Sequence, residues 1–172
     1  MEQCLTTQLK TYGFNRPYIK NVPSDGSCFF HCLSFIYFKR YDYDGSVRNE
    51  LVDGLQESLG DEYDEGYMQN MRKSNTWADG FIVRHAVQQA FREMGVFVFE
   101  YSTETGALKI FCGGEPTSVR GVNAVIVNYD DMHFKCVLPE RVSVSSRRWF
   151  MMAEMPEQRR DRTDEEIDRI IT

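Results

Sequence analysis

The fold of this chain is decided by ten residues that join a turn to an apolar segment: Val22-Pro23-Ser24-Asp25-Gly26-Ser27-Cys28-Phe29-Phe30-His31. The first half of this stretch is rich in residues that form turns, and Cys28 stands where the apolar segment begins. Apolar residues then continue to Phe38 at the dense spacing that suits a buried helix. The pattern predicts a helix that begins at or beside Cys28.

The position of Cys28 favours a reactive thiol. A thiolate is stabilised at the N-terminus of a helix and beside an imidazole. A glycine-containing loop just before a helix can also present backbone N–H groups to a developing oxyanion. Asp25-Gly26-Ser27-Cys28 brings these features together, although Asp-Gly turns precede many helices. Cys28 is therefore a candidate nucleophile.

A base for this thiol must come from another part of the chain, and the sequence offers three histidines. His31 lies three residues after Cys28 on the same predicted helix, so we expect its ring to point away from the thiol. His85 lies within a later amphipathic helix, where we expect a structural histidine. His133 opens a predicted strand at the mouth of a hairpin, where a functional side chain is easily presented. His133 is the best candidate by position.

Three further segments carry helical signals. Ser46 can cap a helix whose apolar stripe repeats every four residues: Val47, Leu51, Leu55 and Leu59. The next segment has the same spacing: Tyr63, Tyr67 and Met71. Thr76 and Asp79 resemble a capping box that opens a helix to about Met94, and Gly95 is placed to end that helix.

The second half of the chain has the pattern of strands. Val96–Tyr101 and Ala107–Cys112 flank a turn and predict a hairpin. Val122–Asn128 and His133–Leu138 predict a second one. Helices therefore come first and antiparallel strands later, which indicates an α+β fold with helices packed around a small, mostly antiparallel sheet.

Length and composition favour one compact domain. A chain of 172 residues with 42% hydrophobic residues is large enough for one core and too short for two comfortable ones. We expect this domain to span residues 1–140, with its core at about 18–139, before a C-terminal extension, 141–172, that carries a short terminal helix. The sequence contains no run of about 20 apolar residues and no signal-peptide layout, so a soluble cytoplasmic protein is expected.

The cysteines and the charge exclude other classes of protein. Five cysteines are an odd number without a framework spacing, so we expect no disulfide scaffold and interpret the four besides Cys28 as small buried residues. A net charge of −6 without a basic face argues against nucleic-acid binding. An acidic surface is compatible with a basic protein partner, although most such surfaces only confer solubility.

Three motifs in order resemble the ovarian-tumour (OTU) family of cysteine proteases. Residues 22–31 resemble its nucleophile motif, an Asp-Gly-x-Cys followed by two apolar residues. Thr76-Trp77-Ala78-Asp79 is similar to the start of the family's Trp-Gly helix, with Ala78 in place of the usual glycine. Ala124-Val125-Ile126-Val127, followed by His133-Phe134, resembles the strand and the His-aromatic pair that carry the base. The resemblance spans about residues 18–139, and the ordered set is more specific than any one motif.

The resemblance implies a papain-like OTU domain that hydrolyses the isopeptide bond between a lysine and the C-terminus of ubiquitin or a ubiquitin-like modifier. Cys28 would attack the carbonyl, and His133 would act as base and then as acid. The oxyanion loop would consist of Asp25, Gly26 and Cys28. The channel for the ubiquitin tail would be flanked by Asp131, Met132, Phe134 and Trp77. Neither a metal nor another cofactor, and no nucleic-acid or membrane partner, is implied, and a viral or bacterial effector would act in the host cytoplasm.

One position departs from the family pattern. Many OTU members carry Asn or Asp two residues after the histidine, where it orients the imidazole, but this chain has Lys135, which cannot accept a hydrogen bond. Another acceptor could replace it: Asp25, Asn21, Asn128 or Asp131. Otherwise a Cys28–His133 dyad suffices, or the enzyme is weak. A dyad helped by an unusual acceptor, with Asp25 as the candidate third catalytic residue, is the preferred hypothesis.

Three alternatives remain at this point. Cys28 could be an ordinary buried cysteine, but the distant Trp77 and His133 signals would then be coincidence. The chain could be an inactive OTU-like module that only binds ubiquitin, although binding alone requires neither Cys28 nor His133. A metal site could use Cys28, His31, Cys32 and His133, but the Cys-x-x-His-Cys spacing lacks a second closely spaced pair of ligands.

Overall fold

The computed structural model describes residues 2–12, 14, 17–90, 95–113 and 124–138. Within these residues five strands form one mixed sheet in the order β1-β5-β4-β2-β3. The strands are β1 (Tyr18–Lys20), β2 (Val96–Tyr101), β3 (Leu108–Cys112), β4 (Ala124–Tyr129) and β5 (His133–Leu138). The β2–β4 pair is parallel, and the other three pairs are antiparallel. The sheet is therefore mostly antiparallel, and the prediction of an α+β fold is confirmed.

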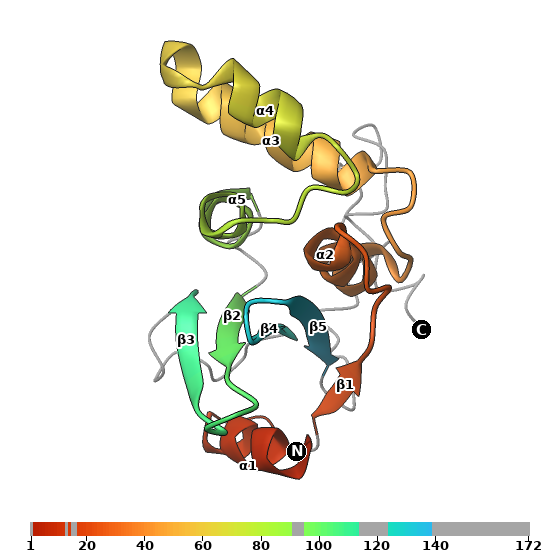
Figure 1. Cartoon of the computed structure of the whole chain (residues 1–172), viewed down its shortest axis with the longest axis vertical. Coiled ribbons are helices and arrows are strands. Elements are labelled where there is room, and N and C mark those ends of the chain that lie inside the picture. Colours follow the sequence, from red (N-terminus) through yellow and green to blue (C-terminus); the bar gives the residue numbers. More distant parts are fainter. Residues whose placement is uncertain (1, 13, 15–16, 91–94, 114–123, 139–172) are drawn as a thin grey trace, which may run out of the picture.

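Helices cover both faces of this sheet, as Figure 1 shows. On one face lie α2 (Cys28–Phe38) and α5 (Gly80–His85), with α3 (Ser46–Leu59) and α4 (Glu65–Met71) packed beyond them. On the other face lies α1 (Glu2–Thr11), which the sequence analysis did not predict. Short helical turns follow α3 at Gly60–Glu62 and α5 at Ala86–Ala90. No helix in the described part of the chain is long and apolar enough to span a membrane.

The strand alternation explains why two hydrophobic cores form. In β2, for example, Val96 and Val98 face the core under α2, whereas Phe97 and Phe99 face α1. Both sets are buried because each face of the sheet is covered. From α1, Leu5 and Leu9 lie one helical turn apart and are fully buried in the second core. This packing holds the N-terminal helix on the sheet.

The predicted strands agree well with the structure. Both predicted hairpins are confirmed: β2 pairs with β3, and β4 pairs with β5. Local turn residues and alternating apolar residues determine these pairs. The pairing of β1 with β5 and the parallel pairing of β2 with β4 join segments that are distant in sequence, and they were not predicted. Val122 and the predicted C-terminal helix lie outside the described residues.

Two of the predicted helix caps are wrong. Helix α2 does begin at Cys28. The start of α3, however, is capped by the carboxylate of Asp42, which accepts the amides of Val47 and Arg48 at 2.9 and 3.1 Å, and Ser46 is the first helical residue. For α5, Asp79 is the N-cap, whereas the hydroxyl of Thr76 donates to the carbonyl of Asn70. A carboxylate accepts two amides at once, which a hydroxyl in either place does not do here.

The predicted helix that opens at Thr76 and Asp79 is interrupted. It was expected to run to about Met94, but α5 ends at His85 and changes to a π-helical turn over Ala86–Ala90. Residues 91–94 lie outside the described residues. Gly95 has a φ of 60°, which suits the predicted helix-terminating glycine.

Candidate active site

Cys28 is the first residue of α2, and its side chain is only 3% exposed. The backbone amides of Phe134 and Phe29 donate to its sulfur, so the thiol lies against the residue that follows His133. Burial raises the pKa of the Cys28 thiol above its ordinary value, and the charge of Asp25 adds to this, while the amide donors lower the pKa. The balance keeps the thiol protonated at neutral pH.

Asp25 holds the loop that precedes Cys28. Its carboxylate accepts the Ser27 amide at 2.8 Å and contacts Nε2 of His31 at 3.1 Å, and its carbonyl accepts the Cys28 amide at 3.2 Å. The other ring nitrogen of His31, Nδ1, accepts the Asp42 amide at 2.9 Å. Because Nδ1 accepts, Nε2 carries the proton and donates it to Asp25. His31 therefore supports the predicted oxyanion loop, a role that the sequence analysis did not assign.

Gly26 allows this loop to lie against a second loop. A Cβ at position 26 would stand 2.5 Å from the backbone carbonyl of Asn75, which is closer than real contacts permit. The hydroxyl of Ser27 donates to the carbonyl of Ser74 at 2.8 Å across the same contact. Residues 72–79, which lead from α4 to α5 through Trp77, are thus packed directly on the loop that leads to Cys28.

His133 is the first residue of β5, opposite Tyr129 at the end of the hairpin. Its Nδ1 lies 3.3 Å from the hydroxyl oxygen of Ser24, a contact between residues 109 positions apart. Burial lowers the pKa of His133 below its ordinary value, Lys135 lowers it further, and Asp25 partly offsets both. The imidazole is therefore neutral at neutral pH and able to take a proton.

Ser24 is a hydrogen-bonding partner of His133 that the sequence analysis missed. Four residues were proposed as hydrogen-bond acceptors for the imidazole, because Lys135 cannot accept. One of them, Asp25, acts on His133 through its charge, while its carboxylate holds His31. Asp131 accepts from the amide of Asn128 at 3.1 Å. A serine next to an Asp-Gly turn is so common that only the three-dimensional structure brings it to the histidine.

Lys135 lies beside His133, because residues two apart in a strand point to the same face, and its charge acts on the imidazole. Its ammonium nitrogen stands 4.5 Å from the centroid of the Tyr129 ring. This cation–π contact gives the lysine a partner other than the histidine.

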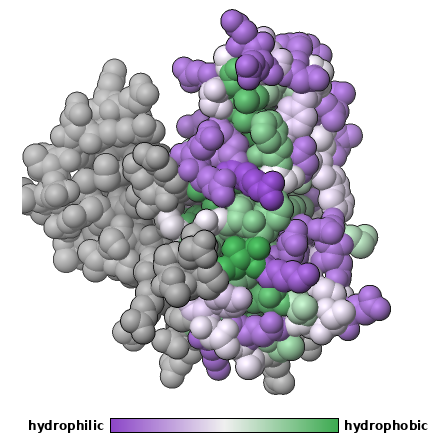
Figure 2. Space-filling model, turned by 90° about the vertical axis from the view of Figure 1, so that its left-hand side faces the viewer, coloured by the Kyte–Doolittle hydropathy of each residue, from purple (hydrophilic) through white to green (hydrophobic). Residues whose placement is uncertain are grey.

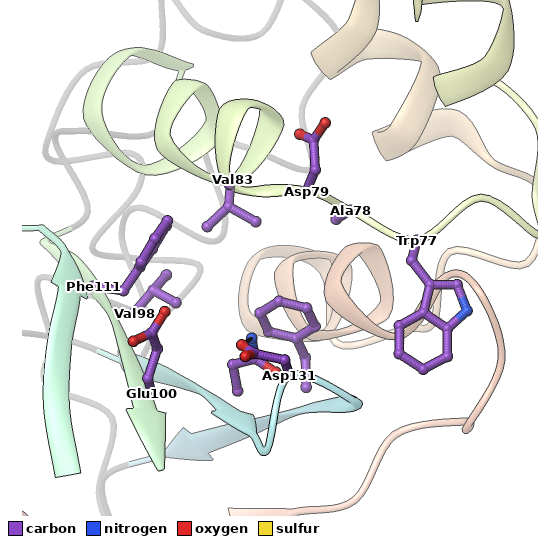
Figure 3. A pocket seen from close by; sticks show the side chains of 11 residues that line it. Trp77, Ala78, Asp79, Val83, Val98, Glu100, Phe111 and Asp131 are labelled. Carbon is purple, nitrogen blue, oxygen red and sulfur yellow. Dashed lines mark hydrogen bonds between the residues drawn. The ribbon is translucent and has the colours of Figure 1, made fainter. Parts of the chain in front are cut away.

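A cavity of about 200 Å³ lies beside the candidate nucleophile, because Phe134, whose backbone amide donates to the Cys28 sulfur, is one of its lining residues. Its floor is apolar, and three of the four predicted channel residues line it: Trp77, Asp131 and Phe134. Met132, the fourth, is 68% exposed and is not part of the lining. Figure 3 shows Trp77 projecting from the segment before α5, and Asp131 from the β4–β5 turn. Carboxylates stand around the apolar floor, from Asp79, Glu100 and Asp131.

The outer face beside this cavity is partly apolar. Figure 2 shows hydrophobic residues gathered in the middle of the face that carries α5 and β3, with hydrophilic residues around them. Among the described residues near this cavity, Phe81 is 50% exposed and Trp77 is 48% exposed. Large exposed aromatic side chains at such a place are typical of a surface that binds another protein.

The other four cysteines and the ligands of the alternative metal site have the following surroundings. Cys32, Cys112 and Cys136 are buried, as predicted, but Cys4 is exposed on α1, contrary to the expectation. Both ring nitrogens of His31 are engaged with Asp25 and Asp42, which leaves neither for a metal. The part of the chain described here holds no group of three or more His, Cys, Asp or Glu residues suited to a metal ion.

Comparison with solved structures identifies the architecture. No protein-family model and no curated protein matches the sequence. Among solved structures, the OTU domain of Hazara virus bound to ubiquitin superposes with a TM-score of 0.54 at 15% identity, covering 74% of this chain and 82% of that one. The chain has the OTU fold. The viral OTU protease of Dera Ghazi Khan virus gives a TM-score of 0.55 at 16% identity, covering 73% and 82%.

Other structures with the OTU fold extend beyond viruses. The OTU domain of OTUD1 superposes with a TM-score of 0.54 at 15% identity and covers 79% of this chain and 93% of that one. An OTU deubiquitinase from Wolbachia pipientis wMel, solved with ubiquitin, gives 0.50 at 16% identity, covering 74% and 99%. The resemblance that the motifs carried is therefore confirmed for the fold, whereas the roles of Cys28, His133 and Asp25 stay predictions.

The raised pKa of Cys28 and the lowered pKa of His133 predict an unusual pH dependence of thiol reactivity and of catalysis. If the thiol and the imidazole are both neutral at rest, alkylation of Cys28 by iodoacetamide should accelerate only above pH 9.0, the ordinary thiol value. The acid limb of kcat/KM should lie below pH 6.5, because the lowered pKa keeps His133 able to accept a proton there. Peptide-resolved mass spectrometry of Cys28 across pH measures the first. Rapid alkylation at pH 6 would indicate a preformed thiolate–imidazolium pair instead.

Proposed function

We propose that this chain is a cysteine-dependent deubiquitinase that hydrolyses isopeptide bonds at the C-terminus of ubiquitin or a ubiquitin-like modifier. The observation that carries the proposal is the place of the Cys28 sulfur. It lies at the start of α2, against the backbone of Phe134, which follows His133 and also lines the cavity. The OTU fold supports the same conclusion, because two of the matched structures are OTU proteins bound to ubiquitin.

The proposed reaction proceeds in two halves. The sulfur of Cys28 attacks the carbonyl carbon of the isopeptide bond, and His133 takes the thiol proton as the C–S bond forms. His133 then returns this proton to the lysine nitrogen, so that the C–N bond breaks and the amine leaves a thioester. Water attacks the thioester with His133 as base, which releases the carboxylate and regenerates the thiol. A neutral thiol–imidazole pair suits this sequence, since proton transfer accompanies the attack.

The oxyanion loop needs a small adjustment in this mechanism. The Cys28 amide donates to the carbonyl of Asp25 over 3.2 Å, which is long for such a bond. We propose that the oxyanion takes over this amide when the tetrahedral intermediate forms. The carboxylate of Asp25 still holds the Ser27 amide and His31, so the rest of the loop stays in place.

The cavity lined by Trp77 and Phe134 is proposed to hold the C-terminal tail of the modifier. A volume of about 200 Å³ fits a short extended peptide and excludes a folded domain. The folded part of the modifier would then rest on the exposed aromatic side chains outside, Trp77 and Phe81.

Hydrolysis of defined chains tests this function. The full-length protein is incubated with ubiquitin dimers of each isopeptide linkage and with the precursors of ubiquitin-like modifiers, and the products are separated by mass. We expect cleavage of at least one ubiquitin substrate, at the same rate with and without EDTA. If no ubiquitin or ubiquitin-like substrate is cleaved by a folded protein, the hydrolase proposal fails, and inhibition by EDTA would point to a metal.

An inactive ubiquitin-binding module is the second candidate, and one set of observations favours it. The pKa of Cys28 is raised, that of His133 is lowered, and Lys135 disfavours the imidazolium. A module of this kind would bind ubiquitin with equal affinity before and after a Cys28→Ala change and would turn nothing over. Isothermal titration of both proteins, together with the cleavage assay, distinguishes the two candidates.

The Lys135→Asn variant tests the unusual position beside the histidine. Removing the charge raises the pKa of His133, and an amide oxygen at this place can accept from the ring, so the hydrolase should keep its activity or gain up to about tenfold. The acid limb of kcat/KM should move to higher pH. Lys10→Asn, which removes the same charge from an exposed position in the last turn of α1, is the control. A large loss of activity in folded Lys135→Asn would give the lysine a positive role in binding the substrate.

A further inference from the structure

Arg48 is a charged residue that the proposed chemistry does not use, yet it is one of the most deeply buried side chains in the described structure. It is only 1% exposed, and it lies in the first turn of α3. Its guanidinium carbon stands 3.9 Å from the centroid of the Phe30 ring, in α2 just after the nucleophile. A buried charge is costly, so its contacts need an explanation.

The guanidinium joins the two loops that flank the candidate nucleophile. From one side it donates to the carbonyl of Gly26 at 3.0 Å and to the hydroxyl of Ser27 at 3.1 Å. From the other side it donates to three backbone carbonyls between α4 and α5: Met71 at 2.8 Å, Thr76 at 2.8 Å and Ser74 at 3.3 Å. The planar fork of arginine can satisfy such a set at once, whereas the single ammonium of lysine cannot.

We infer that Arg48 is a positioning residue that fixes the oxyanion loop and the Trp77 loop relative to each other and adds a buried cation to the surroundings of Cys28. The inference rests on the proposed hydrolase function for its kinetic part only. The bond to the Gly26 carbonyl fixes the orientation of that peptide group, and the bond to Thr76 fixes the residue before Trp77. One side chain thereby sets both the loop before the nucleophile and one wall of the cavity.

The charge of Arg48 also opposes the charge of Asp25. Asp25 raises the pKa of the Cys28 thiol, and the thiolate in turn stabilises the charged form of Arg48. Because electrostatic interaction is reciprocal, the cation favours the thiolate, with a smaller effect on the pKa of Cys28 than burial, the amide donors and the charge of Asp25. Other groups that face this region are Asp42, whose carboxylate caps α3, and His31, whose Nδ1 accepts the Asp42 amide. Burial raises the pKa of Asp42, while the amides of Val47 and Arg48 lower it.

The test compares three variants of the full chain: Arg48→Met, Arg48→Lys and the control Arg72→Met. Arg72 lines the same surface cavity as Arg48 and Gly26. Its guanidinium pairs with Asp53 and Gln56, however, and does not bond to Gly26 or Thr76. Thermal unfolding by circular dichroism first establishes which variants are folded. Two readouts follow: kcat and KM on a fluorogenic ubiquitin amide, and the pH profile of Cys28 alkylation by iodoacetamide, which needs no ubiquitin substrate.

We expect Arg48→Met to move the alkylation profile to higher pH and to lower kcat by about 10- to 100-fold, with a smaller change in KM. Arg48→Lys keeps the charge but loses the fork, so its alkylation profile should stay near the wild-type one while kcat still falls. Arg72→Met should match the wild type in both readouts. A wild-type alkylation profile in folded Arg48→Met overturns the electrostatic part of the inference.

The positioning role and the electrostatic role of Arg48 can each be tested apart from its effect on stability and apart from the proposed function. If Arg48→Met does not fold, the kinetics of Arg48→Lys decide, and a wild-type kcat in that variant overturns the positioning role. A drop in melting temperature alone, with unchanged kcat and alkylation profile, would show that Arg48 is merely structural. If even the wild type cleaves no ubiquitin substrate, the proposed function fails, while the alkylation profiles still test the effect of Arg48 on Cys28.

Discussion

The Cys28→Ala variant is expected to lose at least about four orders of magnitude in the rate of ubiquitin-conjugate hydrolysis, because no other nucleophile is predicted for this site. The fold should remain, since the change removes one sulfur atom from a residue that starts α2 and leaves the backbone of the turn unaltered. The rate is measured on a fluorogenic ubiquitin amide, with near-ultraviolet circular dichroism to verify packing.

Cys32→Ala is the matched control for this variant. Cys32 lies one helical turn further along α2 and is fully buried, so its loss costs packing but removes no proposed catalytic group. It should retain activity in proportion to its folded fraction. Wild-type turnover by folded Cys28→Ala would mean that the nucleophile is assigned to the wrong residue.

His133→Ala should be almost as damaging and should lower kcat by about 10³-fold. The raised pKa of Cys28 makes this dependence stronger, because the thiol must lose its proton during the attack and has little thiolate at neutral pH. The rate of the variant should rise steeply with pH as hydroxide replaces the base. A kcat measured from pH 6 to pH 10 records both effects.

His85→Ala provides the comparison. His85 is also buried, its pKa is also lowered by burial, and its Nδ1 contacts Gln89 at 3.1 Å, far from the loop of Cys28 in the sequence. Its loss should reduce the melting temperature and leave the activity of the folded protein near that of the wild type. Equal activity of His133→Ala and His85→Ala would transfer the base role to another group.

Local patterns predicted the elements that depend on neighbours in sequence. The helix start at Cys28 and both hairpins follow from turn residues and apolar periodicity within about ten residues. Helix α1 had a weak signal in the spacing of Leu5 and Leu9, but its burial depends on the far face of the sheet. The parallel β2–β4 pair arises because β3 lies at the edge and β4 pairs with the opposite side of β2, an arrangement that no local pattern specifies.

The candidate site also combines residues that the sequence predicted with residues that only the folded structure brings together. The sequence brought Cys28, His133 and three lining residues of the cavity into one hypothesis, because the motifs occur in a specific order. It did not indicate Ser24, since a serine in a turn has many roles. Arg48 left a weaker signal: it stands next to Val47 and four residues before Val52, which places it at the edge of the apolar stripe of α3. A charge at such a place has partners that only the folded structure identifies.

The most direct test of the central claim is the reaction of the intact protein with a ubiquitin probe that carries an electrophile at its C-terminus. We expect a single covalent adduct with the mass of one probe, mapped by peptide mass spectrometry to Cys28 and absent in Cys28→Ala. The exposed thiol of Cys4 serves as the internal control for nonspecific labelling. A folded protein that forms no adduct, or that is labelled at Cys4 and not at Cys28, would contradict the account.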